Sequence, residues 1–273
     1  MSDDEFAGLP DRVDTTTMHP ARRYNYWLGG KDYFPVDRES AEAIDRVTPS
    51  ARLGAQENRW FLQRAVRHLA RQGFRQFLDI GTGLPTAENT HEIAQGIDPS
   101  SRVVYVDNDP LILLHADALL TSAPEGATAY LEADLRTPER ILADPRLRET
   151  LDLTQPVALM LVAILHFIRD DEDPERIVRT LVDALPVGSC VVVSHATFEF
   201  LTPEVIARSV VLNDGRFSAR SGERLAGLLT GAGLELVEPG VQSVARWWPD
   251  AAPQPRPSIE EVGVNGAVAR VVP

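Results

Sequence analysis

The chain has 273 residues and a formal net charge of −13, with 25% charged and 44% hydrophobic residues. This length and mix predict one large globular domain with a substantial core. The excess of acid excludes a general nucleic-acid binder, whose affinity depends on cations that neutralise phosphates. The single cysteine, Cys190, excludes a disulfide framework and a cysteine-based zinc knuckle.

No uncharged apolar stretch reaches the roughly 18 residues that a membrane span requires. The first residues, Met-Ser-Asp-Asp-Glu, lack the basic head and apolar run of a signal peptide. We therefore expect a cytoplasmic protein that does not enter membranes. The histidines are scattered without a His-x-x-x-His pair, so no metal site is expected.

The N-terminal part of the chain is predicted to form a flexible start, residues 1–19, and a helical cap, residues 20–73. Apolar residues at helical spacing predict helices over 38–47 and 50–71. The segment 20–75 holds 11 basic and 6 acidic residues, whereas the remainder of the chain is acidic. Two interpretations remain open: the basic segment packs on the acidic body, or some of its arginines face an anionic ligand.

From residue 74 to 273 short apolar runs alternate with helical stretches, several of which begin at an Asp-Pro or Thr-Pro pair that provides a helix cap. This alternation predicts an α/β fold with a doubly wound, mostly parallel sheet. The expected strands are 76–80, 102–106, 127–131, 157–162, 189–194, 234–238 and 267–272.

The turn after the first strand carries Gly81 and Gly83, and a helix is expected from about Thr86 to Gln95. Such a turn lies at the carboxyl edge of the sheet, where ligands bind. A dinucleotide fingerprint would have a third glycine at Thr86. Asp79 would repel a pyrophosphate but attract an ammonium or sulfonium group. The turn therefore favours a cationic nucleoside.

Acids also follow the next two strands. Asp107 ends the second strand, where a carboxylate accepts hydrogen bonds from both ribose hydroxyls. Asp109 precedes Pro110 and is expected to cap a helix. Asp134 follows the third strand, where it contacts an adenine amino group or serves as a turn residue.

Three acids at successive strand ends and the Gly-x-Gly turn resemble the S-adenosylmethionine site of Rossmann-like class I methyltransferases. The resemblance implies the seven-strand order of that fold with its last strand antiparallel. The cofactor-binding residues that we expect are Asp79, Gly81, Thr82, Gly83, Asp107, Asn108, Asp134, Leu135 and Ala163. A closer resemblance, to an actinobacterial S-adenosyl methyltransferase family that began as a domain of unknown function, runs through segments 26–32, 57–59, 77–86, 106–110 and 161–167.

His166 follows the fourth strand at the same edge, and the resemblance places this region beside the methyl-transfer centre. It either takes a proton from an attacking hydroxyl or amine, or packs against the adenine or caps the next helix. His195 is a weaker candidate for the same role. Cys190 is expected in the core.

The aromatic segment 22–32 has two interpretations, a lid over the cofactor or a helix docked by its aromatic side chains. As a lid, it would pair Arg22 or Arg23 with the methionine carboxylate. The substrate or lid residues that we expect are Arg22, Tyr24, Tyr26, Trp27, Lys31 and Asn58, with Arg59 on the same wall.

The predicted function is methyl transfer from S-adenosylmethionine, leaving S-adenosylhomocysteine, to a small-molecule acceptor that the sequence does not identify. A non-catalytic regulator that binds the cofactor remains an alternative. An NAD-dependent oxidoreductase is disfavoured by Asp79 and Thr86. Nothing in the sequence indicates an oligomeric state.

Overall fold

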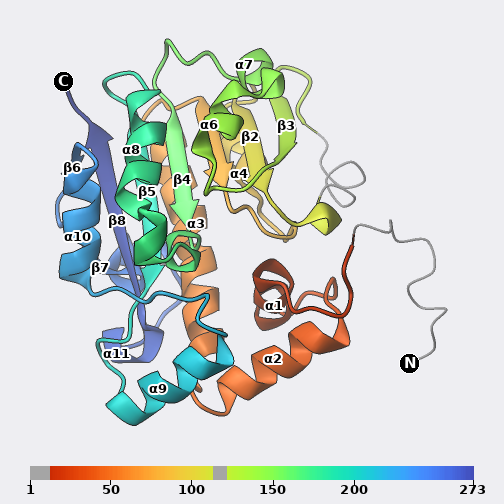
Figure 1. Cartoon of the computed structure of the whole chain (residues 1–273). Helices are drawn as coiled ribbons and strands as arrows, with labels where there is room; N and C mark the ends of the chain where they lie inside the picture. Colours follow the sequence, from red (N-terminus) through yellow and green to blue (C-terminus); the bar gives the residue numbers. More distant parts are fainter. Residues whose placement is uncertain (1–12, 113–121) are drawn as a thin grey trace.

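The computed structural model describes residues 13–112 and 122–273, and within them the chain forms one sheet between two layers of helices (Figure 1). The strand order is β3-β2-β1-β4-β5-β8-β6, with β7 paired to β8. Strands β1 to β5 pair in parallel, whereas β8 is antiparallel to both β5 and β6. The strands are β1 (Gln76–Ile80), β2 (Arg102–Asp107), β3 (Ala127–Glu132), β4 (Ala158–Val162), β5 (Cys190–Ala196), β6 (Leu234–Leu236), β7 (Gln242–Ser243) and β8 (Val264–Val271).

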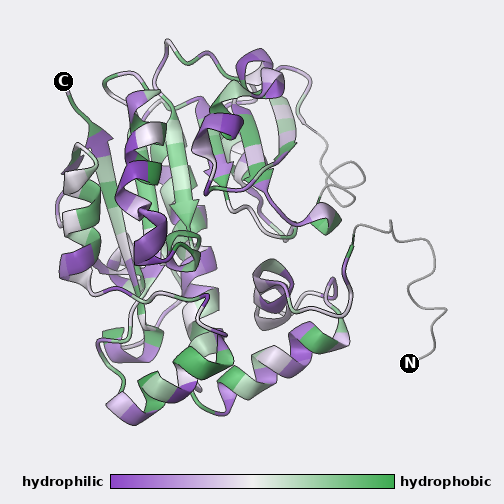
Figure 2. Cartoon of the chain, viewed as in Figure 1, coloured by the Kyte–Doolittle hydropathy of each residue, from purple (hydrophilic) through white to green (hydrophobic). Residues whose placement is uncertain are grey.

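The helices cover both faces of this sheet. Alternation along each strand sends Leu78 and Ile80 into one core with α8 and α10, and Phe77 into the other with α3 and α4. Figure 2 shows the central strands mostly in green and the surrounding helices in mixed green and purple. The α-helices are α1 (Pro20–Trp27), α2 (Pro35–Asp45), α3 (Ala51–Arg71), α4 (Thr90–Ile97), α6 (Pro138–Ala143), α7 (Pro145–Thr150), α8 (Pro174–Asp183), α9 (Pro203–Leu212), α10 (Gly222–Gly231) and α11 (Ile259–Val262); the 3-10 turns are η2 (Leu165–Phe167), η3 (Asp170–Glu172), η4 (Val244–Arg246) and η5 (Pro249–Ala251).

The predicted fold class and the antiparallel last long strand are confirmed. The boundaries differ where local capping decides them. Helix α4 begins at Thr90 rather than Thr86, because Asn89 and Glu92 form a capping box there. Strand β8 begins at Val264, three residues earlier than predicted, since Gly263 ends α11 with φ of 58°. The two-residue strand β7 had no signal in the sequence.

Helices α1, α2 and α9 lie beyond the ends to which the parallel strands point (Figure 1). Helix α1 packs on α2 and α3, and α2 packs on α9. The cap and the segment after β5 therefore close over the same edge of the sheet. None of the helices among the described residues has the length and apolarity to cross a bilayer.

Candidate functional site

A cavity of about 580 Å³ lies between the carboxyl ends of the strands and the helices that cover them. This volume falls within the range of small-molecule and cofactor sites. The predicted site residues that line it are Arg22, Tyr24, Trp27, Asn58, Asp79, Gly81, Thr82, Gly83, Asp107, Asn108, Asp134, Leu135, Ala163 and His166. Positions spread over 145 residues of sequence thus meet at one place.

The glycine turn is built around Asp107. The backbone N–H of Gly83 donates to Asp107 Oδ2 at 2.8 Å, and Gly81 N–H donates to the carbonyl of Val106. Gly81 and Gly83 have φ of 77° and 67°, in the region that favours glycine. A Cβ at Gly81 would also approach the Ile164 side chain to 2.8 Å. Glycine is therefore required at position 81 for both conformation and space.

Asp79 and Asp107 are buried carboxylates that line the cavity. Asp79 is 4% exposed and accepts a hydrogen bond from Thr90 Oγ1 at 2.6 Å. Burial raises the pKa of Asp79 to about 6 and also raises the pKa of Asp107. In the described part of the chain neither carboxylate has an arginine or lysine at ion-pair distance. Two such groups fit a ligand that brings positive charge and hydroxyl donors.

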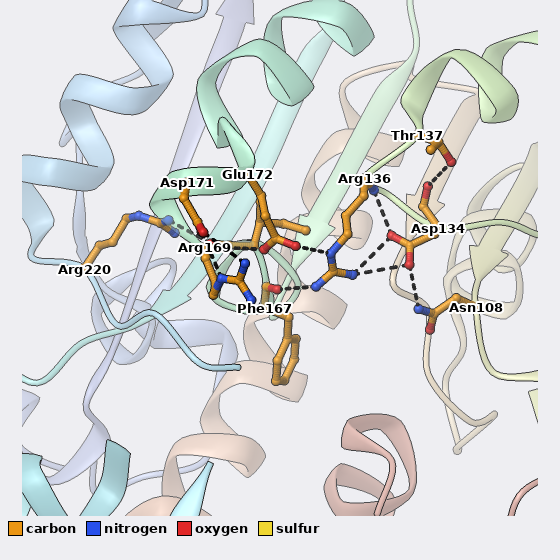
Figure 3. A network of polar contacts seen from close by, with 10 residues as sticks. Asn108, Asp134, Arg136, Thr137, Phe167, Arg169, Asp171, Glu172 and Arg220 are labelled. Atoms are coloured by element: carbon orange, nitrogen blue, oxygen red, sulfur yellow. Dashed lines mark hydrogen bonds and ion pairs between the residues drawn. The ribbon is translucent and has the colours of Figure 1, made fainter. Parts of the chain in front are cut away.

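Asp134 belongs to a polar network at the rim of the cavity (Figure 3). Its carboxylate accepts hydrogen bonds from Asn108 Nδ2 at 3.2 Å, from the backbone of Arg136 at 2.8 Å and from the guanidinium of Arg136. Arg136 also donates to Glu172 and to the carbonyl of Phe167. Asp134 thus has the turn role that the sequence left open, while it and Leu135 line the cavity.

The guanidinium of Arg22 forms an ion pair with a carboxylate of the protein itself. Its Nε and Nη2 atoms donate to the two oxygens of Asp109, each at 2.8 Å, and its Nη1 donates to the carbonyl of Asp14. The expectation that Arg22 pairs with a methionine carboxylate is corrected, because a buried two-point ion pair already uses its guanidinium. Asp109 also accepts from Leu111 N–H at 3.0 Å, which agrees with its predicted capping role.

Tyr26 and Lys31 do not reach the cavity lining. The hydroxyl of Tyr26 donates to Glu42 at 3.3 Å, and its ring packs edge-on against Tyr33 with centroids 5.0 Å apart. Lys31 is exposed on the loop after α1. The prediction that these two residues line the lid is wrong, because the face of α1 that carries Tyr26 packs toward α2. Trp27 lines the cavity while its Nε1 donates to Asp45.

A chain of hydrogen bonds connects α1 with the loop after β4. Tyr24 donates to the carbonyl of Ala55, Asn58 Nδ2 donates to the Tyr24 hydroxyl at 2.9 Å, and Ser194 Oγ donates to Asn58 Oδ1. The Ser194 hydroxyl in turn accepts the N–H of Ala163 at 2.9 Å. Ala163 has φ of 57°, a conformation that costs energy for a residue with a Cβ. Asn58 therefore joins the cap to the expected cofactor loop.

His166 lies at the cavity wall in an aromatic cluster. Its ring is 4.8 Å from that of Phe217 and 5.5 Å from that of His195. Burial, and then the charges of His195, Arg23 and Arg220, hold the pKa of His166 well below its usual value. His166 is therefore neutral at physiological pH.

His195 does not line the cavity. Its Nδ1 contacts the carbonyl of Ala196 at 2.8 Å, and its Nε2 contacts Arg220 at 2.9 Å. Both ring nitrogens therefore have protein partners, which leaves His195 a structural role. Cys190 is buried in β5, as predicted.

Sequence reasoning missed the part of the wall that follows β5. Phe198, Phe217 and Asn213 line the cavity from the segments around α9. These segments carry no motif, and only their position after a strand end could have suggested them. Among residues 13–112 and 122–273 no group of three potential metal ligands is present.

The strand order, the antiparallel β8 and the carboxylate-lined cavity define the class I S-adenosylmethionine-dependent methyltransferase fold. Residues 7–272 match the model of a family described as S-adenosyl methyltransferase. The chain belongs to this family, and S-adenosylmethionine is its cofactor. No curated protein matches the chain.

Solved structures agree with this assignment. A DUF574 family protein from Streptomyces avermitilis is 48% identical, with a TM-score of 0.90 over 96% of this chain and 100% of that one. A candidate methyltransferase from Thermobifida fusca is 38% identical, with a TM-score of 0.87 over 98% of this chain and 100% of that one. Human N-acetylserotonin methyltransferase, solved with S-adenosylmethionine, shares the fold at 14% identity and a TM-score of 0.50, over 92% of this chain and 62% of that one.

Proposed function

We propose that this protein is an active enzyme that transfers the methyl group of S-adenosylmethionine to a small molecule held between the sheet edge and the cap. The observation that carries the proposal is the pair of buried carboxylates, Asp79 and Asp107, which line the cavity and have no arginine or lysine at ion-pair distance among the described residues. The volume of about 580 Å³ leaves room for an acceptor beside a nucleoside.

In this proposal the cofactor follows the strand ends. Asp79 receives the ammonium group, and the Gly81–Gly83 turn allows close approach of the methionine part. Asp107 keeps unused lone pairs for the ribose hydroxyls, since each of its oxygens accepts a single backbone N–H. Asn108, Asp134 and Leu135 border the adenine.

In this proposal Arg59 has the role that the sequence analysis gave to Arg22 or Arg23. It lines the cavity beside Asp79, and its charge lowers the pKa of that acid. Its Nη2 donates to the carbonyls of Ala87 and Glu88, whereas its buried Nε has no hydrogen-bond partner within residues 13–112 and 122–273. A cation next to Asp79 suits the zwitterionic end of the cofactor, with ammonium on Asp79 and carboxylate on Arg59.

When bound, the cofactor supplies a methyl group made electrophilic by its positively charged sulfur. The protein then has to position the acceptor, exclude water and receive a proton. The aromatic side chains around His166 and the cap position the acceptor and exclude water. The lowered pKa makes His166 a weak base, and its Nδ1 accepts the N–H of Ala196 at 3.4 Å. In this proposal it therefore gives up that contact when it takes the proton that a hydroxyl or amine loses as its new bond to carbon forms.

Calorimetry with S-adenosylmethionine, S-adenosylhomocysteine and NAD tests the binding step, followed by transfer of a labelled methyl group to a metabolite library. We expect saturable binding of both sulfur nucleosides, no binding of NAD, and label in one chemical class of product. NAD binding without a response to S-adenosylmethionine would refute the proposal. Tight cofactor binding without transfer to any compound would favour the regulator instead.

A further inference from the structure

Five of the described arginines line the cavity, and they differ in whether a carboxylate lies at ion-pair distance. Arg22 pairs with Asp109, Arg136 with Asp134 and Glu172, and Arg216 with Asp214; these pairs account for three of the five. Arg23 and Arg59 have no carboxylate at ion-pair distance in the part of the chain that the structure describes. Arg59 lies beside the proposed methionine end, which leaves Arg23 as a second uncompensated cation.

Arg23 is held firmly in place although it lacks a counter-ion. Its side chain is 3% exposed, Nη2 donates to Asn213 Oδ1 at 2.9 Å, and Nη1 donates to Ser40 Oγ at 3.3 Å. The guanidinium lies over the Trp27 ring, 5.3 Å from its centroid, and its buried Nε has no hydrogen-bond partner among the residues that the structure describes. Burial lowers the pKa of Arg23 to about 10, so the group is still charged at neutral pH. The charge of Asp37 offsets part of this lowering, but Asp37 lies beyond ion-pair distance, and a buried charge without a direct counter-ion is costly.

The position of Arg23 points to the acceptor rather than to the cofactor. Its partners come from α2 and from the end of α9, which lie beyond the ends to which the parallel strands point (Figure 1). Asn213, which accepts its hydrogen bond, is four residues before Phe217, and the ring of Phe217 is 4.8 Å from that of His166, so Arg23 and His166 line the same part of the cavity. That part also contains Phe198 and Phe217, whose ring centroids are 5.9 Å apart.

We propose that Arg23 binds a carboxylate of the methyl acceptor, and that the acceptor is a small carboxylic acid whose apolar body packs on Phe198 and Phe217. One guanidinium supplies one positive charge, which matches a carboxylate and leaves a phosphate dianion half compensated. The inference rests on the proposed function, because it assumes that the nucleoside occupies the Asp79 and Asp107 side of the cavity.

The test uses aromatic acids and their primary amides as matched probes: phenylacetate, cinnamate, indoleacetate and salicylate, each with its amide. Binding to the full-length protein saturated with S-adenosylhomocysteine is measured by calorimetry. We expect at least one acid to bind about tenfold more tightly than its amide, and Arg23→Gln to abolish that preference. Equal affinity of acids and amides, or no saturable binding of any acid, would overturn the inference.

Arg52→Gln is the matched control. Arg52 is a partly exposed arginine on α3 that pairs with Asp45 at 3.6 Å and lies over the Tyr26 ring outside the cavity. Its replacement changes the net charge by the same amount. The preference for acids should survive in this variant, and its loss there would point to a general charge effect. Should Arg23→Gln fail to fold, Arg23→Lys keeps the charge without the planar fork and should weaken acid binding severalfold.

A second measurement separates this inference from the proposed function. S-adenosylmethionine and methylthioadenosine, which lacks the amino-acid end, are titrated into Arg23→Gln and Arg59→Gln. We expect Arg59→Gln to weaken only S-adenosylmethionine, and Arg23→Gln to leave both affinities within about twofold of the wild type. Selective loss of S-adenosylmethionine in Arg23→Gln would place the methionine carboxylate on Arg23 and refute the acceptor role. Failure of the wild type to bind S-adenosylmethionine would instead refute the proposed function.

Discussion

Arg22 and Asp109 form a two-point ion pair across 87 residues of sequence, with both hydrogen bonds at 2.8 Å. Arg22 comes from α1 in the cap, and Asp109 follows β2. The N–H of Asp109 also donates to Asp107 Oδ1 at 3.0 Å. The cap is therefore fixed to the strand end that holds the proposed ribose acid.

We predict that Arg22→Gln lowers the free energy of unfolding by about 3–5 kcal/mol, because it removes the arginine that bonds both oxygens of the buried Asp109 carboxylate. Denaturant unfolding followed by circular dichroism measures this change. Arg67→Gln, which removes an exposed pair with Glu88, is the control and should cost less than about 1 kcal/mol. A double variant with Asp109→Asn should lose less than the sum of the single variants.

Asp79→Asn is expected to stabilise the ligand-free protein while it weakens cofactor binding. The pKa of Asp79 in the folded protein is about 6, above that of the unfolded chain, so its contribution to stability is greatest in acid and is lost as pH rises through about 6. Asparagine still accepts the Thr90 hydrogen bond and carries no charge. Thermal melts should show a gain of about 1–3 kcal/mol near neutral pH that disappears below about pH 4.

The same acid predicts how cofactor affinity depends on pH. An ammonium beside Asp79 favours the ionised carboxylate, so binding to the wild type should weaken as pH falls below about 6. Asp79→Asn should bind S-adenosylmethionine about tenfold more weakly at neutral pH and show little of this dependence. A wild-type affinity that is constant from neutral pH down to about pH 5 would contradict the ammonium assignment.

Asp107→Ala should weaken S-adenosylmethionine binding by about 1–3 kcal/mol through loss of the hydrogen bonds to ribose. The carboxylate also organises the turn through Gly83, so Asp107→Asn serves as a milder variant that keeps an acceptor. Calorimetry with adenosine isolates the ribose contribution. An affinity equal to that of the wild type in both variants would show that the ribose lies elsewhere.

His166 should remain neutral well below pH 6.5, the ordinary histidine value, because the folded protein buries it beside Arg23 and other charges. NMR of histidine side chains measures this directly, with His166→Asn to assign the signal. The pKa of His166 is lower in the folded protein than in the unfolded chain. His166 therefore destabilises the folded protein as pH falls below its pKa in the unfolded chain. A His166 signal that titrates near its ordinary value would contradict this prediction.

Residues close to a strand end were predictable from the sequence. Asp107 is the last residue of an apolar strand, and Gly83 is three residues beyond another. Parallel strands bring such ends together at one edge of the sheet. The ion pair of Arg22 with Asp109 was not predictable, because the two residues become neighbours only when the cap folds over the loop after β2. Tyr26 and Trp27 are adjacent in sequence, and which of them faces the cavity depends on how an eight-residue helix packs.

The wall contributed by α9 was missed for a different reason. Asn213 is an ordinary helix-end residue in the sequence, and its contact with Arg23 joins positions 190 residues apart. Phe198 and Phe217 stand in irregular segments without periodicity. Their meeting depends on tertiary packing, about which local patterns carry little information.

The bond between Arg23 and Asn213 has an implication for how such a protein diversifies. The groups proposed to face the nucleoside belong mainly to the central strands and their turns. Arg23, Asn213 and Phe198 belong to peripheral segments, which we expect to be exchangeable without rebuilding the core. Grafting the 198–217 stretch from a homologue should therefore transfer that homologue's choice of compound to this scaffold and leave its methyl donor unchanged.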